Sequence, residues 1–266
     1  MQTQTGFAEV NGTRLYYEVA GSGHPLVLIH GSTLDTRMWD NQFEPFAQHY
    51  TVVRYDVRGF GKSALPTGES YARPDDLKGL LDYLDIAHAS VLGLSMGGGI
   101  AIEFALTYPQ ATDALILVDA TLGGWPSSPE YAAFQNTVRV RAREAGVQAA
   151  RDAWLSGPFF TPALENPAVA PRLVQIISDY AGGHWVHPYP IRELVPPAIQ
   201  RLDTIRVPTL IIIGERDIPD FQAIADRLQQ RIPNARKVVM PGVGHMANME
   251  DSERFNAIVL DFLAEQ

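Results

Sequence analysis

The segment Ser90-Val-Leu-Gly-Leu-Ser95-Met-Gly-Gly98 decides the fold, because an apolar run passes into a helical stretch around one serine. The run is typical of a strand buried on both faces, and Met96–Tyr108 favours a helix that the next proline ends. Gly93, Ser95 and Gly97 form a G-x-S-x-G pattern. In a strand-to-helix turn, this pattern places the serine hydroxyl above the sheet on a strained backbone, where larger side chains would collide. We therefore predict that Ser95 is a nucleophile.

Similar apolar runs lie on both sides of this segment, and amphipathic stretches separate them. The predicted strands are Phe7–Val10, Arg14–Val19, Pro25–His30, Tyr50–Asp56, Ser90–Leu94, Ala114–Asp119, Pro208–Gly214 and Lys237–Met240. Further helices are predicted at Asp75–Leu84, Phe221–Arg231 and Ser252–Ala264. The first two strands, joined through Asn11-Gly12, form a hairpin. Alternation of strand and helix indicates an α/β fold with a mostly parallel eight-stranded sheet flanked by helices.

Residues 122–204 interrupt this alternation after the sixth strand. They contain no buried strand, they hold three of the four tryptophans, and their composition favours helices at 130–146, 147–156, 171–182 and 191–202. We interpret this segment as a helical cap inserted into a core made of residues 1–121 and 205–266.

Composition excludes several classes of function. The chain has 266 residues, no cysteine and a formal net charge of −9, so thiol chemistry is excluded and nucleic-acid binding is disfavoured. No apolar run approaches the roughly 18 residues of a membrane span. The polar stretch Met1–Glu9 does not resemble a signal peptide, so we expect a cytoplasmic protein without a membrane partner. The sequence leaves a homodimer open.

A serine nucleophile needs a base, and His245 is the best placed of the seven histidines. It lies in a glycine-rich loop after the last strand, at the carboxyl edge of the sheet, whereas His24, His49 and His88 precede strands and belong to the opposite edge. Asp217, which follows another buried strand, is predicted to orient the imidazole. Its competitors for that role are Glu215, Asp220 and, at the end of the preceding strand, Asp119.

Two backbone N–H groups are predicted to form an oxyanion hole. One belongs to Met96, directly after the nucleophile at a helix N-terminus, and the other to Ser32, in the loop after the third strand. Gly31 would give this loop freedom to turn. We expect the neighbouring His30 to hydrogen-bond within the loop rather than act as a base.

Taken together, these segments resemble the α/β-hydrolase fold over essentially the whole chain. The matching residues are His30-Gly-Ser32, Arg54-Tyr-Asp-Val-Arg-Gly-Phe-Gly-Lys-Ser63, Gly93-Leu-Ser-Met-Gly-Gly98, Gly214-Glu-Arg-Asp217 and Gly242-Val-Gly-His245. Within that superfamily, Met38-Trp39 and the serine segment resemble the 3-oxoadipate enol-lactonase and small carboxylesterase branch. The resemblance implies that Asp56 and Arg58 belong to a structural turn. It also implies hydrolysis of a small ester or lactone through an acyl-enzyme on Ser95, without a cofactor.

The sequence leaves some alternative functions open and excludes others. A C–C bond hydrolase, a perhydrolase, a hydroxynitrile lyase and a slow-turnover ligand sensor can all carry the same three residues. A phosphate-binding loop at Gly61-Lys-Ser63 fails because Asp56 stands where the motif needs a glycine. No helical H-E-x-x-H or paired carboxylate–histidine spacing appears, so we expect no metal site.

The cap is expected to determine which substrate is accepted. We predict that its aromatic residues line an apolar pocket over the serine, with Trp125, Trp154, Phe159 and Trp185 as the main candidates and Phe160 and His187 as further ones. An anionic lactone would need a cation, which Arg139, Arg141, Arg143 or Arg192 could supply. The first three of these arginines stand at alternate positions, however, which is typical of a solvated helix face.

Overall fold

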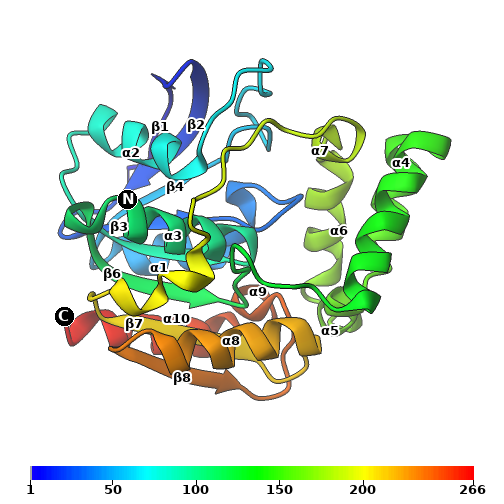
Figure 1. Cartoon of the computed structure of the whole chain (residues 1–266). Coiled ribbons are helices and arrows are strands. Elements are labelled where there is room, and N and C mark those ends of the chain that lie inside the picture. The colour runs from blue at the N-terminus through cyan, green and yellow to red at the C-terminus, as the bar shows by residue number, and fades with distance from the viewer. Residues whose placement is uncertain (1) are drawn as a thin grey trace.

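A computed structural model describes residues 2–266, and it confirms the predicted eight-stranded, mostly parallel sheet flanked by helices (Figure 1). The strands are β1 (Gln4–Val10), β2 (Thr13–Ala20), β3 (Pro25–Ile29), β4 (Thr51–Tyr55), β5 (Ala89–Leu94), β6 (Thr112–Val118), β7 (Thr209–Gly214) and β8 (Ala235–Met240). The helices are α1 (Asp40–Ala47), α2 (Arg73–Tyr83), α3 (Met96–Thr107), α4 (Pro129–Leu155), α5 (Thr161–Glu165), α6 (Ala170–Asp179), α7 (Gly183–Val186), α8 (Pro219–Arg231), α9 (Ala247–Glu250) and α10 (Ser252–Ala264).

The strands of the sheet have the order β1-β2-β4-β3-β5-β6-β7-β8. β1 and β2 form the predicted hairpin and β2 runs antiparallel to β4, whereas all other neighbours are parallel. Every residue of β5 and β7 is buried, because helices cover the sheet: α2 packs beside α3, and α1 beside α10.

The strand register brings the predicted functional loops to one edge. Ile29 at the end of β3 pairs with Gly93 of β5, and Leu94 pairs with Val118 at the end of β6. Val118 in turn pairs with Ile212 of β7, two residues before Gly214 at the carboxyl end of that strand. The residues that follow these four strands therefore emerge side by side.

The segment between β6 and β7 is helical, and Figure 1 shows α4, α6 and α7 grouped at one side of the sheet. α4 joins the two predicted cap helices across a break at Gly146, whose φ of 83° and ψ of 174° are not helical. The predicted helix over residues 191–202 is wrong. Only single 3₁₀ turns form there, at Ala198–Gln200 and Leu202–Thr204, because two consecutive prolines directly precede the first turn and neither can donate a backbone hydrogen bond.

No helix in the described part of the chain is both long enough and apolar enough to cross a lipid bilayer.

Candidate active site

Ser95 lies at the sharp turn between β5 and α3 in a conformation that few non-glycine residues adopt, with φ of 53° and ψ of −114°. A Cβ atom on Gly93 would lie 2.2 Å from the carbonyl oxygen of Gly97, and one on Gly97 would lie 2.1 Å from that of Ile29. The turn is held in place because the Ser95 N–H donates to Val118 and the Ser95 carbonyl accepts from Thr121. Surrounding structure thus maintains the strain that the serine position requires.

His245 and Asp217 form a buried hydrogen-bonded pair. Nδ1 of His245 lies 2.7 Å from Oδ2 of Asp217, whose side chain is fully inaccessible to solvent. The other carboxylate oxygen accepts from the N–H of Ile218 at 2.7 Å, and the imidazole packs against Phe221 with ring centroids 4.3 Å apart. An ionised Asp217 therefore selects the imidazole tautomer with its proton on Nδ1, which leaves Nε2 free to accept a proton.

Glu250, at the end of α9, holds the histidine loop and was not identified from the sequence. Its two carboxylate oxygens accept from the N–H groups of Gly244 and Met246, the residues on either side of His245, at 2.8 and 3.0 Å. Burial raises the pKa of this carboxyl. In the sequence, the only signal was a glutamate five residues after His245, which many loops share.

The other predicted acids have different partners. Glu215 accepts from the N–H of Gly242 at 2.8 Å, and Asp220 accepts from the N–H of Ser128 at 2.8 Å, at the start of α4. Neither is recorded as a partner of His245. The geometry therefore brings together Asp217 and His245, as the sequence predicts, and uses the two competitors to fasten loops.

Asp119 lies directly behind this pair. One of its oxygens accepts from the N–H of Gly214 at 2.9 Å, while the other is buried and has no hydrogen-bond partner. Oxygen atoms of Asp119 and Asp217 and a ring nitrogen of His245 lie within 4.8 Å of one another. Burial, and then the charge of Asp217, raise the pKa of Asp119 well above its usual range. Asp217, and not Asp119, is thus the carboxyl group that hydrogen-bonds to the histidine.

Replacing Asp119 by asparagine is expected to stabilise the protein at neutral pH by on the order of 1 kcal/mol or more, because the neutral amide avoids the cost of protonating this buried carboxyl in the folded chain. The amide oxygen can still accept from Gly214, and the backbone φ of 44° suits asparagine. Because the pKa of Asp119 is higher in the folded than in the unfolded chain, unfolding releases a proton and wild-type stability falls as pH rises above the unfolded pKa. Urea unfolding from pH 4 to 8 should show the advantage of Asp119→Asn growing with pH. A gap that is constant across this range would contradict the assignment.

The loop after β3 reaches the same site. Ser32 shares a cavity with Ser95, and Met96 is the first residue of α3, so both predicted oxyanion donors belong to segments that meet at the serine. The positive φ in this loop falls at Thr33 (65°), not at Gly31, so the predicted reason for a glycine at Gly31 is wrong.

His30 hydrogen-bonds within its surroundings, as expected. Its Nε2 accepts from the N–H of Val57 at 2.9 Å, so its Nδ1–H donates to the carbonyl of Gly31 at 2.8 Å. Burial lowers the pKa of this histidine. A neutral, doubly bonded His30 is a structural residue of the loop.

A small cavity of about 10 Å³ joins the serine to the histidine, which is space for about one water molecule. Apart from Ser32, Ser95 and His245, its lining is mainly apolar: Gly31, Leu34, Leu94, Tyr131, Trp154, Phe159, Phe160 and Met246. Tyr131 also lines a larger apolar hollow of about 340 Å³ between α4 and the start of α8. This tyrosine therefore lies between the hollow and the cavity that contains Ser95.

The predicted cap residues divide into two groups. Trp154, Phe159 and Phe160 line the cavity, and Phe159 meets the His245 ring edge-on with centroids 5.4 Å apart. The lining residues do not include Trp125, Trp185 or His187. Trp185 is buried against Trp154 with centroids 6.1 Å apart. Tyr131 and Leu34 line the cavity without having been predicted, because nothing in their sequence neighbourhood distinguishes them from core residues.

Two groups of side chains among the described residues have the atoms that metal ions bind. One is Asp119, Asp217 and His245, where the short His245–Asp217 hydrogen bond fits proton transfer. The second is His24, His88 and Asp113, at the opposite edge of the sheet.

Comparison with known proteins gives independent evidence of the family to which the chain belongs. The model of a family described as the alpha/beta hydrolase family matches residues 26–258. A 2-hydroxy-6-oxononadienedioate/2-hydroxy-6-oxononatrienedioate hydrolase from Paraburkholderia xenovorans (strain LB400) is 31% identical over 94% of this chain and 91% of its own length.

Solved structures show the same likeness. The enol-lactonase from Burkholderia xenovorans LB400 superposes with a TM-score of 0.81 at 30% identity, covering 97% of this chain and all of the other. A thermophilic esterase from Thermogutta terrifontis superposes with a TM-score of 0.79 at 27% identity, covering 98% of each chain. All three similar proteins are described as hydrolytic enzymes.

Proposed function

The chain belongs to the α/β-hydrolase family, and on that premise we propose that it is a serine hydrolase of small, neutral esters or lactones. The observation that carries the proposal is the apolar cavity shared by Ser95 and His245, with Asp217 hydrogen-bonded behind the histidine. A nucleophile, a base and an acid that orients the base are the groups that acyl transfer needs.

In this mechanism Ser95 Oγ attacks the carbonyl carbon of the substrate while Nε2 of His245 takes the hydroxyl proton. The oxyanion accepts hydrogen bonds from the N–H groups of Met96 and Ser32. Collapse of the tetrahedral intermediate breaks the bond to the alcohol oxygen, which leaves with the proton from His245. Water then attacks the acyl-enzyme by the same steps in reverse order and releases the acid. In a lactone, the alcohol and the acid remain parts of one product.

A neutral substrate fits the charges around the site. The cavity-lining residues, taken from the described chain, include no lysine or arginine. Arg139, Arg141 and Arg143 are exposed on α4, and Arg192 pairs with Asp75 at 2.7 Å. A carboxylate on the substrate would therefore enter the cavity without a cation to balance it, which is costly in an apolar environment.

Hydrolysis of a C–C bond is the second candidate, and the similarity to the Paraburkholderia hydrolase favours it. The name of that enzyme denotes substrates with two carboxylates, which this cavity does not match in charge. The two candidates thus predict opposite preferences for charge on the substrate. A perhydrolase, a hydroxynitrile lyase or a ligand sensor would use the same three residues. Each would differ from an esterase in its turnover or in its product.

A substrate panel distinguishes these candidates. Short-chain aryl esters and neutral lactones are expected to be turned over many times, with kcat/KM at least about tenfold above that of carboxylate-bearing analogues, a difference of about 1.4 kcal/mol. Mass spectrometry after an acid quench should find the acyl group on the peptide that contains Ser95. Turnover of dicarboxylate ring-cleavage products alone would support the second candidate, and a single burst without further turnover would support a sensor.

A further inference from the structure

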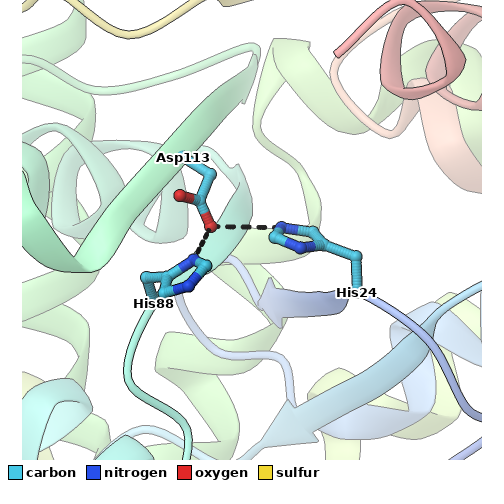
Figure 2. Close-up of side chains that lie close together, drawn as sticks. All are labelled: His24, His88 and Asp113. Carbon is cyan, nitrogen blue, oxygen red and sulfur yellow. Dashed lines mark hydrogen bonds and ion pairs between the residues drawn. The ribbon is translucent and has the colours of Figure 1, made fainter.

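Three side chains with metal-binding atoms gather at the edge of the sheet opposite Ser95. His24 directly precedes β3, His88 directly precedes β5, and Asp113 is the second residue of β6. Because β3, β5 and β6 are parallel neighbours, their amino ends lie side by side, and Figure 2 shows the three side chains pointing toward one another. The predicted placement of His24 and His88 at the opposite edge is therefore confirmed.

The three side chains meet at a single oxygen atom. Oδ2 of Asp113 lies 2.5 Å from Nδ1 of His88 and 3.1 Å from Nε2 of His24, and the two imidazole rings are 5.8 Å apart between centroids (Figure 2). All three ligand atoms lie within 4.8 Å of one another. The side chains of His24, His88 and Asp113 are 38%, 54% and 36% exposed, so an ion can reach them from solvent.

We propose that His24, His88 and Asp113 bind a divalent transition-metal ion, for which Zn²⁺ is the representative. Two imidazole nitrogens and one carboxylate oxygen form a ligand set that zinc commonly uses, with bonds of about 2.0–2.2 Å. In tetrahedral geometry such bonds place the ligand atoms about 3.4 Å apart. The 3.1 Å between Asp113 and His24 lies close to that value, whereas the 2.5 Å between Asp113 and His88 must widen by about 0.9 Å. Rotations of these exposed side chains would admit the ion.

Binding of the ion determines which ring nitrogen of each histidine carries the proton. Without metal, Nδ1 of His88 and Nε2 of His24 lie within hydrogen-bond or ion-pair distance of Asp113, so each can carry a proton shared with the carboxylate. A metal takes the lone pair of the same nitrogen, so each neutral ring then holds its single proton on its other nitrogen.

A fourth ligand has room beside the cluster. His24 and Asp113 line a hollow of about 490 Å³, together with Tyr50, Ser90, Pro208, Leu263 and Gln266. Water or a small anion in this hollow could complete the coordination, as at open three-ligand zinc sites. The sequence showed no metal motif because the ligands lie at positions 24, 88 and 113 and meet only through the order of the strands.

Isothermal titration calorimetry of the full chain with Zn²⁺ tests the proposal. We expect saturable binding of one ion at this cluster, weakened at least tenfold by His24→Asn and by His88→Asn and abolished by the double substitution. His49→Asn is the matched control, because His49 is another exposed histidine that precedes a strand at this edge and is not part of the cluster. Circular dichroism of the metal-free variants verifies that they fold.

A thermal measurement separates this site from the catalytic residues. With Zn²⁺ at 100 times its Kd, the Tm of the wild type should rise by roughly 5–10 °C, and the double variant should show no such rise. Because His245 and two aspartates also form a potential metal cluster, His245→Asn serves as a second control and should keep the effect. The proposal is overturned if the wild type does not bind Zn²⁺, if the His24 and His88 variants bind it as tightly as the wild type, or if only His245→Asn abolishes binding.

Discussion

The Ser95→Ala variant is expected to lose about 10⁵-fold or more in kcat toward short-chain aryl esters, which leaves only the rate that oxyanion stabilisation and binding supply. The substitution removes one oxygen atom and leaves His245 without the hydroxyl whose proton it takes. Alanine keeps the Cβ atom, so the strained turn should persist and the Tm should stay close to that of the wild type. Steady-state kinetics with the aryl ester, together with a Tm for each protein, measure both effects.

Ser90→Ala is the matched control for this loss. Ser90 lies on the same strand, β5, and is also buried, but it is at the amino end of the strand, away from the catalytic cavity. We expect the activity of Ser90→Ala to stay within about twofold of the wild type, in line with the small effects of substitutions away from functional features. Near-normal turnover in Ser95→Ala would show that the proposed mechanism is wrong.

The Asp217→Asn variant is expected to lower kcat by about 10⁴-fold. The amide oxygen can still accept from the N–H of Ile218, which leaves the amide N–H₂ to face Nδ1 of His245. That contact favours the imidazole tautomer with its proton on Nε2, and this tautomer cannot accept the proton of Ser95. The position of the His245 ring is kept, but the ring can no longer act as the base. The kcat of purified, folded Asp217→Asn on the same ester measures the effect.

Asp119→Asn separates the two carboxylates that lie near the histidine. Asp119 accepts from Gly214 and makes no hydrogen bond to His245, so its substitution should lower kcat by less than about tenfold, within the range of residues that do not touch the reacting groups. A mild effect of Asp217→Asn combined with a severe effect of Asp119→Asn would transfer the orienting role to Asp119.

The core and its catalytic loops could be predicted because each rests on a local pattern. Apolar runs, and the hairpin signal at Asn11-Gly12, identified the eight strands, and the order of a parallel sheet then placed Ser95, Asp217 and His245 at one edge. Local composition failed at residues 191–202, where two consecutive prolines outweigh the neighbouring helix formers.

Contacts between distant segments could not be predicted in this way. Whether a cap tryptophan lines the cavity or packs behind it depends on how α4 meets the core, so Trp154 and Trp185 look alike in the sequence and differ in the structure. The bonds from Glu250 to the two amides beside His245, and the meeting of His24 with Asp113, likewise exist only after the chain has folded.

The small size of the cavity beside Ser95 has a kinetic consequence. A space of about 10 Å³ holds a water molecule but not an ester, so we expect substrate to bind only to molecules in which some of the lining side chains have moved. The apparent dissociation constant is then the intrinsic one divided by the fraction of molecules that are open. Changes in the cap that never touch the substrate can therefore alter KM by shifting this population. Differences in KM among cap variants of this protein would therefore reflect how readily the cavity opens, as well as how well it fits the substrate.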